Sequence, residues 1–461
     1  MELPKSFIEQ LQQLLPNEWQ ALCEAIVGTE PSVSVRVNTQ RSATVPADAL
    51  RVPWCEAGFY CASRPAFTFD PAFHSGLYYV QDASSMFLLH VLQSLVDAPV
   101  RYLDLCAAPG GKTTTALGAL PTGSLVVANE IVTTRARILR DNVVKWGNPG
   151  VVVTNNAPRH LGQLTHFFDI VATDVPCSGE GMMRKDDEAV AQWTPTLIEE
   201  CAARQRTIID DVWPALRPGG LLIYSTCTYN RQENEQMVEY IISHYNAEPV
   251  TVPTMAEWNI MGSIGNNFPT YRFMPHRTNG EGLFMAILRK PDEASKPEKQ
   301  SIRKGKNSKA TKPLPPSVTK WISAPQDYEI SINGDEVVAM PHALQQEMHM
   351  LSERLNTLYC GITLGTIKGK NCIPAHALAL SEALNKDTFA RCEVDYSTAL
   401  AYLRGEAVTL DAPRGHVLVT HRGAPLGWAN NLGNRANNLY PKSLRIISTH
   451  APTVYTPIID Y

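Results

Sequence analysis

The chain has 461 residues, a hydrophobic content of 44%, a charged content of 19% and a formal net charge of -4 at pH 7. This balance excludes wholesale disorder, and no apolar run approaches the roughly 18 residues that a membrane span needs. The length exceeds what one compact core usually fills, so we expect several domains. The first residues lack a basic segment followed by an apolar one, which predicts a cytoplasmic protein with no membrane partner.

An alternation of helices and strands follows a smaller amino-terminal segment. Residues 1–75 combine helically spaced apolar residues with an alternating run at 33–38, so we expect a small α/β domain there. Within residues 76–290, six apolar strands are predicted between helical stretches: Tyr102–Leu105, Leu125–Asn129, Val151–Thr154, Ile170–Thr173, Leu221–Ser225 and Phe284–Leu288. This pattern predicts an α/β fold class with a doubly wound, Rossmann-like, mainly parallel sheet.

A change of composition follows this region. Residues 291–325 are dense in Lys, Ser and Pro and poor in apolar residues, which predicts a basic flexible linker. Residues 326–461 mix short helices with strand-like runs such as 417–420 and a turn-rich stretch at 427–431. We therefore expect a smaller α/β or β-rich module after the linker.

A glycine-rich loop follows the first predicted strand of the sheet, the position where such sheets bind ligands. Two glycines allow a close backbone approach, and the helix expected from residue 113 can bind a negative group at its amino end. A nucleotide phosphate loop is disfavoured because its first required glycine would fall at Cys106, and a purely structural turn is the alternative. The candidate cofactor-binding residues of the loop are Cys106, Ala107, Ala108, Pro109, Gly110, Gly111 and Lys112.

Polar residues follow the next two predicted strands. Glu130 could accept hydrogen bonds from both hydroxyls of a ribose, although a helix-capping carboxylate is an equal alternative. Asn155 and Asn156 follow the third strand and could contact an adenine ring, but asparagine is also common in turns.

The chain has ten cysteines but no CxxC pair, which argues against zinc, and we expect no metal. Cys177 and Cys227 each end a predicted strand, beside the same expected ligand site. A thiolate there could add to carbon-6 of a cytosine, activate carbon-5 for methylation and then leave by elimination. Asp174 is placed to contact the base and transfer a proton. Buried core cysteines are the alternative, and this chemistry alone leaves open which thiol attacks.

Three motifs carry a resemblance to a known family: CAAPGGKT from residue 106, DVPCSGEGMMRKD from 174 and RPGGLLIYSTCTYNRQENE from 217. They resemble those of the Sun-type RNA cytosine carbon-5 methyltransferases. The resemblance implies S-adenosylmethionine as cofactor, Cys227 as nucleophile and Cys177 as the residue that assists product release. It also implies that residues 106–112, Glu130, Asn156 and Asp174 line the cofactor and base sites.

Outside these motifs, residues 34–39 and 79–82 resemble the amino-terminal region of the family. Gly405-Glu406, Gly427-Trp428 and Tyr440-Pro441-Lys442 resemble the tail of its bacterial RsmF group. That likeness implies an RNA-binding amino-terminal domain, a PUA-like RNA-binding module within residues 326–461, and ribosomal RNA, specifically 16S, or the small ribosomal subunit as partner. Reaching carbon-6 requires a flipped or single-stranded cytosine. We expect a monomer. The alternatives are a transfer RNA or DNA cytosine methyltransferase, with the cysteine roles exchanged in the DNA enzyme, or a non-catalytic ribosome-assembly factor.

Overall fold

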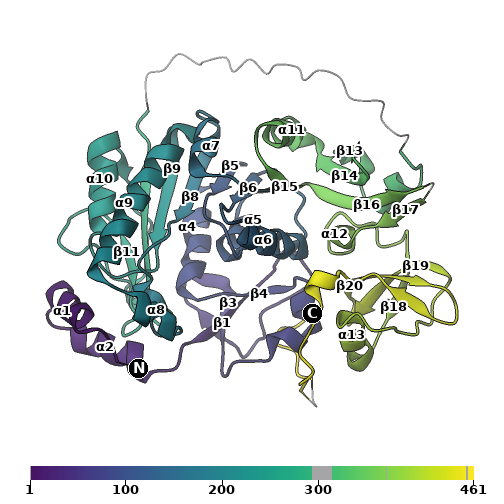
Figure 1. Cartoon of the computed structure of the whole chain (residues 1–461), viewed down its shortest axis with the longest axis horizontal. Helices are drawn as coiled ribbons and strands as arrows, with labels where there is room; N and C mark the ends of the chain where they lie inside the picture. The colour runs from purple at the N-terminus through teal and green to yellow at the C-terminus, as the bar shows by residue number, and fades with distance from the viewer. Residues whose placement is uncertain (1, 293–313, 370, 453–454) are drawn as a thin grey trace.

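The structure is a computed structural model that describes residues 2–292, 314–369, 371–452 and 455–461 (Figure 1). Most of the linker predicted over residues 291–325 therefore lies outside the described residues. Within the described part, no helix is both long and apolar enough to span a bilayer.

A nine-stranded sheet lies at the centre of the described chain, in the order β10-β12-β9-β8-β5-β6-β7-β15, with β11 paired to β12. Its strands are β5 (Arg101–Asp104), β6 (Leu125–Asn129), β7 (Val151–Thr154), β8 (Phe168–Asp174), β9 (Leu216–Thr226), β10 (Glu248–Pro249), β11 (Tyr271–Phe273), β12 (Leu283–Arg289) and β15 (Thr357–Cys360). The pairs joining β7, β6, β5, β8 and β9 are parallel. The predicted α/β class and all six predicted strands are confirmed.

Helices cover both faces of this sheet (Figure 1). They are α4 (Phe87–Leu95), α5 (Gly111–Ala119), α6 (Thr133–Trp146), α7 (Pro158–Gly162), α9 (Pro195–Val212), α10 (Glu235–Tyr245) and α11 (Gln345–Arg354). Val126 and Ala128 of β6 pack in a cluster with α4, α5 and α6, whereas Leu125 and Val127 pack in a second cluster with α7, α9, α10 and α11. Both faces of the strand are therefore buried, as expected of a parallel sheet between helices.

The amino-terminal region contains α1 (Lys5–Leu14), α2 (Trp19–Gly28) and a four-stranded sheet of β1 (Val33–Val37), β2 (Leu50–Val52), β3 (Cys55–Cys61) and β4 (Tyr78–Val80). Arg36 of β1 is 1% exposed and joins this sheet to the central domain. Its Nε donates to Gln81 Oε1 at 2.7 Å, and its Nη2 donates to Thr114 Oγ1 of α5 at 2.6 Å. The guanidinium lies 4.6 Å from the Trp146 ring, a cation–π contact.

The carboxyl-terminal region forms two further four-stranded sheets. The first contains β13 (Tyr328–Asn333), β14 (Glu336–Pro341), β16 (Ile362–Lys368) and β17 (Asn371–Pro374), and the second β18 (Ala390–Glu393), β19 (Gly415–His421), β20 (Ala424–Asn431) and β21 (Ala436–Asn438). Between β14 and β16 the chain contributes β15 to the central sheet, antiparallel to β7. The expectation of a turn-rich stretch at 427–431 is wrong, because these residues belong to β20 and bury Trp428 to 1% exposure.

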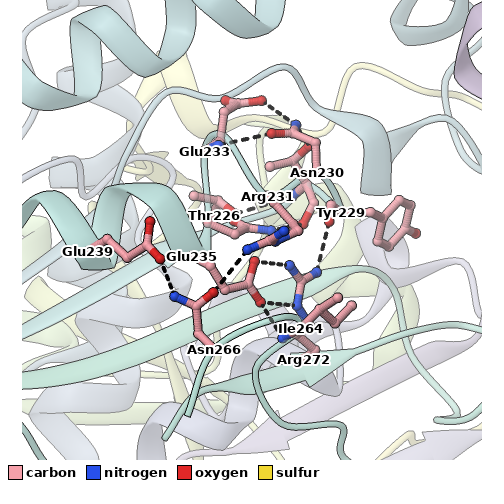
Figure 2. A network of polar contacts seen from close by, with 12 residues as sticks. Thr226, Tyr229, Asn230, Arg231, Glu233, Glu235, Glu239, Ile264, Asn266 and Arg272 are labelled. Carbon is pink, nitrogen blue, oxygen red and sulfur yellow. Dashed lines mark hydrogen bonds and ion pairs between the residues drawn. The ribbon is translucent and has the colours of Figure 1, made fainter. Parts of the chain in front are cut away.

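A buried ion pair stabilises the chain that follows β9 (Figure 2). Arg272 of β11 and Glu235 at the start of α10 are 1% and 0% exposed, and Arg272 Nε lies 2.8 Å from Glu235 Oε1. Arg272 Nη1 also donates to the carbonyl oxygen of Tyr229 at 2.8 Å, while the Ile264 N–H donates to Glu235. The pair therefore fixes the main chain two residues after Cys227.

Replacing Glu235 by glutamine should strongly destabilise the protein, because a buried guanidinium would lose its counter-charge. Such losses cost about 3–5 kcal/mol. We expect a clearly lower melting temperature for Glu235→Gln by circular dichroism. Glu239→Gln is the matched control on the same helix: Glu239 is exposed and accepts from Asn266, so its change should stay within about 0.5 kcal/mol. Equal melting temperatures for the two variants would contradict this prediction.

Candidate active site

The carboxyl ends of the parallel strands meet at one edge of the central sheet. Asp104 at the end of β5 lies opposite Ala128 of β6, and Asp174 at the end of β8 lies opposite Ser225 of β9. The loops that follow these strands therefore lie together, where doubly wound sheets bind ligands. All the predicted site residues lie in these strand ends and loops.

The glycine-rich loop runs from the end of β5 into α5, which begins at Gly111. Gly110 has a φ of 115°, a left-handed conformation that glycine adopts most readily. A Cβ atom at this position would lie 3.3 Å from Leu139 Cδ1 of α6, closer than most such contacts. Both conformation and space therefore favour glycine where the backbone turns into the helix.

The carbonyl groups of this loop are held by α6. Arg135 Nη2 donates to Ala108 O at 2.9 Å, and Asn142 Nδ2 donates to Pro109 O at 2.8 Å. The Cys106 thiol lies 3.9 Å from Thr173 Oγ1, and burial raises its pKa to about 12. Cys106 therefore stays a neutral thiol and can serve the loop through packing and its backbone.

Two carboxyl groups lie on either side of Lys112. Burial raises the pKa of Asp104 to about 7, although the hydroxyl of Thr113 donates to it at 2.6 Å and opposes the shift. Lys112 Nζ lies 2.8 Å from Asp174 Oδ2, and Ser225 Oγ donates to Asp174 Oδ1 at 2.9 Å. Burial lowers the pKa of Lys112, but the attraction of Asp174 and Asp104 outweighs burial and raises it. Lys112 is therefore a cation that links the glycine-rich loop to the end of β8.

Glu130 follows β6 and is 3% exposed. Its Oε1 accepts from the Val132 N–H at 2.9 Å, and its Oε2 lies 3.4 Å from Arg135 Nη1. A carboxylate offers about four lone-pair sites, so these two contacts leave acceptor capacity for the hydroxyls of a ribose. The glycine-rich backbone lies one strand away. Together, this backbone and the Glu130 carboxylate fit a nucleoside that bears an anionic group, such as the carboxylate of S-adenosylmethionine.

The two asparagines after β7 have partners within the chain. Asn155 Nδ2 donates to the carbonyl oxygen of Glu130 at 2.6 Å. Asn156 Oδ1 accepts from the Asn356 N–H at 3.1 Å, and Asn156 Nδ2 donates to Asn356 O at 3.2 Å. The Asn156 side chain thus connects the cofactor edge of the sheet to the residue before β15, and its expected contact with adenine stays a prediction.

The two cysteines expected to act together lie side by side. The Sγ atoms of Cys177, after β8, and Cys227, after β9, are 3.2 Å apart. The hydrogen bond to Cys227 and burial raise the pKa of Cys177 well above its usual range, so Cys177 keeps its proton at neutral pH. The Gly181 N–H donates to Cys227 O at 2.8 Å, which joins the two loops through their main chains.

Two carboxylates that the sequence interpretation did not single out hold these loops together, and both are 0% exposed. Glu233, after Cys227, accepts from the Ser178 N–H at 3.0 Å and from the Ser178 hydroxyl in the other loop. Glu180, after Cys177, accepts from the N–H groups of Tyr229 and Asn230 at 2.7 and 2.9 Å. Each cysteine loop therefore supplies a carboxylate that binds the main chain of the other.

Asn230 and Gln205 complete the network around Glu233. The Asn230 side-chain amide donates to Glu233 Oε1 at 2.8 Å, as Figure 2 shows, and Gln205 Nε2 of α9 donates to Oε2 at 2.8 Å. Burial raises the pKa of Glu233, and hydrogen bonds from Ser178 and Asn230 oppose that rise. A signal was present in the sequence, since both carboxylates lie within the cysteine motifs, but their cross-loop pairing requires the fold.

Comparisons with known families cover three parts of the chain. Residues 95–289 match the family described as 16S rRNA methyltransferase RsmB/F. Residues 3–83 match the N-terminal domain of 16S rRNA methyltransferase RsmF, and residues 389–446 match the methyltransferase RsmF PUA domain. A solved structure titled as a methyltransferase homolog protein from Pyrococcus horikoshii is 26% identical, with a TM-score of 0.53, and the match covers 62% of this chain and 95% of that one.

Relatives that match nearly the whole chain belong to the same group of methyltransferases. The ribosomal RNA small subunit methyltransferase F of Erwinia tasmaniensis is 30% identical, and the match covers 96% of this chain and 96% of the relative. The protein of the same name from Aliivibrio fischeri is also 30% identical, over 96% of this chain and 97% of the relative. The resemblance inferred from the motifs is confirmed: the chain belongs to the family of ribosomal RNA small subunit methyltransferases F.

Proposed function

We propose that this chain methylates carbon-5 of a cytosine in 16S ribosomal RNA through a covalent adduct between Cys227 and carbon-6. The single observation that carries the proposal is the 3.2 Å separation of the Cys177 and Cys227 sulfurs. They lie at the ends of two neighbouring strands, beside the Asp174–Lys112 ion pair. The names of the full-length relatives support ribosomal RNA of the small subunit as the substrate.

The cofactor of this family reaction is S-adenosylmethionine, which supplies the methyl group when bound. Residues 106–112 would hold it through the backbone at the start of α5, and the Glu130 carboxylate would accept from its ribose. Asp174 lies between this loop and the cysteines, because it pairs with Lys112 and accepts from Ser225. An adenine contact by Asn156 is part of the same proposal.

The two cysteines take different roles. Cys177 keeps its proton, and its sulfur lies 3.2 Å from the sulfur of Cys227, within reach of a hydrogen bond. The Cys227 thiolate adds to carbon-6 of a flipped cytosine, and this addition makes carbon-5 nucleophilic. Asp174 contacts the base and transfers a proton on the ring side. Once carbon-5 carries the methyl group, Cys177 relays a proton: it gives its own proton to the departing sulfur of Cys227 and takes the proton from carbon-5. The bond between Cys227 and carbon-6 breaks, the ring double bond is restored and the methylated product is released.

The remaining expectations concern the whole molecule. The PUA domain matched at residues 389–446 supports binding of folded RNA by the carboxyl-terminal region. The domain limits at residues 75, 290 and 325, the monomeric state and the cytoplasmic location stay predictions. An RNA substrate and a methyltransferase active site together disfavour the alternative of a non-catalytic assembly factor.

Bisulfite sequencing of RNA from cells with and without this protein tests the substrate. We expect one or a few cytosines of 16S ribosomal RNA to lose their protection from conversion when the gene is deleted. Wild-type protein supplied from a plasmid should restore the protection. Loss of protection in transfer RNA, with ribosomal RNA unchanged, would contradict the ribosomal assignment while leaving the chemistry intact.

Alanine variants of the two cysteines test the chemistry. Cys227→Ala should abolish methyl transfer and form no adduct, because it lacks the attacking sulfur. Cys177→Ala should accumulate a protein–RNA adduct that survives denaturing electrophoresis, because addition proceeds and release does not. An inactive Cys177→Ala variant without adduct would exchange the two roles, as in the DNA enzymes. Cys201→Ala, on the buried side of α9, is the thiol control and should retain activity.

Glu233→Gln tests the positioning of the two loops. All the hydrogen-bond partners of the Glu233 carboxylate among the described residues are donors, so a glutamine amide must direct its NH₂ group at one of them, at a cost of about 1–3 kcal/mol. We expect kcat to fall roughly tenfold while the KM for S-adenosylmethionine is retained. The matched control is Glu199→Gln on the exposed side of α9. A variant that loses stability but keeps kcat would show that Glu233 is structural only.

A further inference from the structure

A cationic cavity of about 250 Å³ lies where the amino-terminal region meets the carboxyl-terminal sheets. Four basic residues from three separate segments line it: Arg41, Lys386, Arg391 and Arg422. No acidic residue is among the described residues that form its lining. This grouping is unexpected in a chain with a net charge of -4, and it points to an anionic ligand.

Arg41 adds a buried positive charge to the lining of this cavity. Its Nη2 donates to the carbonyl oxygen of Trp146 at 3.3 Å and to that of Leu380. Its Nε is buried and has no hydrogen-bond partner among the described residues. The Nε atom has almost no accessible surface, so Arg41 acts on a ligand in the cavity through its charge and not through this donor. Burial lowers the pKa of Arg41 to about 10, which still leaves the guanidinium charged at neutral pH.

Arg422 occupies a backbone position that does not favour it. It lies in the tight turn between β19 and β20, where His421 pairs with Ala424. Its φ is 51° and that of Gly423 is 78°, a combination typical of turns in which asparagine or glycine is preferred. A non-glycine residue held in this region often marks a functional site. The Arg422 guanidinium lies 5.0 Å from the centroid of the Tyr461 ring, and this cation–π contact holds the side chain beside the cavity.

Three carboxylates near the cavity offset part of this charge. Glu382 attracts the Arg41 guanidinium, which opposes the effect of burial on the pKa of Arg41. Asp387 lies 3.5 Å from Arg391, but both side chains are largely exposed, so the pair is weak. Glu393 Oε2 accepts from Thr420 Oγ1 at 2.7 Å and from the Gly423 N–H at 3.2 Å. Lys386 forms no hydrogen bond or ion pair with any other residue that the structure describes.

We propose that this cavity binds a phosphodiester of the substrate RNA backbone, held by Arg41 from the amino-terminal region and by Lys386, Arg391 and Arg422 from the carboxyl-terminal region. A phosphodiester carries the negative charge and the acceptor oxygens that these cationic side chains attract, and arginine pairs with phosphate in a forked geometry. A contact of this kind fixes the register of an RNA without reading its sequence. The proposal rests on the proposed function, because it takes RNA as the substrate.

The decisive variant is Arg422→Asn. Asparagine suits the positive φ of the turn, so the substitution removes the charge without disturbing the fold. We expect the melting temperature to be equal or higher, whereas binding of a ribosomal RNA fragment weakens roughly tenfold. The slope of log K against log salt should decrease by about 1, as for one lost phosphate contact. Lys386→Gln should show the same two changes, and Arg422→Lys should retain most of the salt dependence.

A control separates this cavity from general surface charge. Arg354 is the last residue of α11, which Figure 1 shows well apart from β19 and β20. Arg354→Gln should therefore leave the RNA affinity and the slope of log K against log salt unchanged. The proposal is overturned if Arg422→Asn and Lys386→Gln bind the RNA as wild type does. A second outcome would also overturn the proposal: millimolar inorganic phosphate stabilises wild type but not Arg422→Asn, while the two proteins bind the RNA equally. The cavity would then be a site for a free anion.

The proposed function has a separate readout. If wild type methylates ribosomal RNA and the two variants bind that RNA as wild type does, only the phosphate site is rejected. Absence of both RNA binding and methyl transfer in wild type would reject the proposed function, and this site with it. The affinity of each variant for S-adenosylmethionine, measured by titration calorimetry, shows that the central domain has kept its fold.

Discussion

The reciprocal hold between the two cysteine loops is the constraint on which the site depends. Cys177 and Cys227 follow different strands, so their separation is set by loops rather than by the sheet ladder. Glu180 in one loop accepts from main-chain N–H groups of the other, and Glu233 accepts from Ser178 in return. Hydrogen bonds to a charged group contribute about 1.5–3 kcal/mol each, and leaving such a carboxylate unpaired in a buried position costs more. The arrangement that satisfies both carboxylates also brings the two sulfurs to 3.2 Å.

Further ion pairs extend this constraint to the cofactor side and to the core. Lys112 connects the glycine-rich loop to Asp174, one strand away from Cys227, so the loop and the cysteines are positioned by the same charged group. Arg272 and Glu235 fix the chain beyond Tyr229 from the opposite side. Polar networks of this kind specify a single arrangement when every polar group in them has a hydrogen-bond partner. Such an arrangement suits the proposed reaction, which requires the sulfur, the base and the methyl donor to be aligned with one another.

The sequence predicts the parallel strands well because each is buried on both faces and therefore forms an apolar run, as at Leu125–Asn129 and Val151–Thr154, whose observed limits are the predicted ones. It predicts the candidate site for the same reason, since Asp174 and Cys227 end or follow such runs. It does not reveal β15, because that strand is short and half-buried, and its pairing with β7 spans about 200 residues of chain. The roles of Glu180 and Glu233 could not be predicted for a related reason: spacing along the chain does not show that two loops form hydrogen bonds with each other.

Strand β15 ties the first carboxyl-terminal sheet to the central sheet beside the candidate active site. It lies between β14 and β16 in the sequence, so the first carboxyl-terminal sheet is tied at both ends to a strand of the central sheet. The Asn156–Asn356 hydrogen bonds reinforce this connection directly beside the cofactor edge. That sheet cannot rotate away without breaking the β7–β15 ladder. The cationic cavity is lined from the second carboxyl-terminal sheet and from Arg41, whose Nη2 donates to the carbonyl oxygen of Trp146 at the end of α6. Under the two proposals, an RNA that occupied both the cavity and the cysteine site would be selected by its own shape and by the spacing of its phosphates.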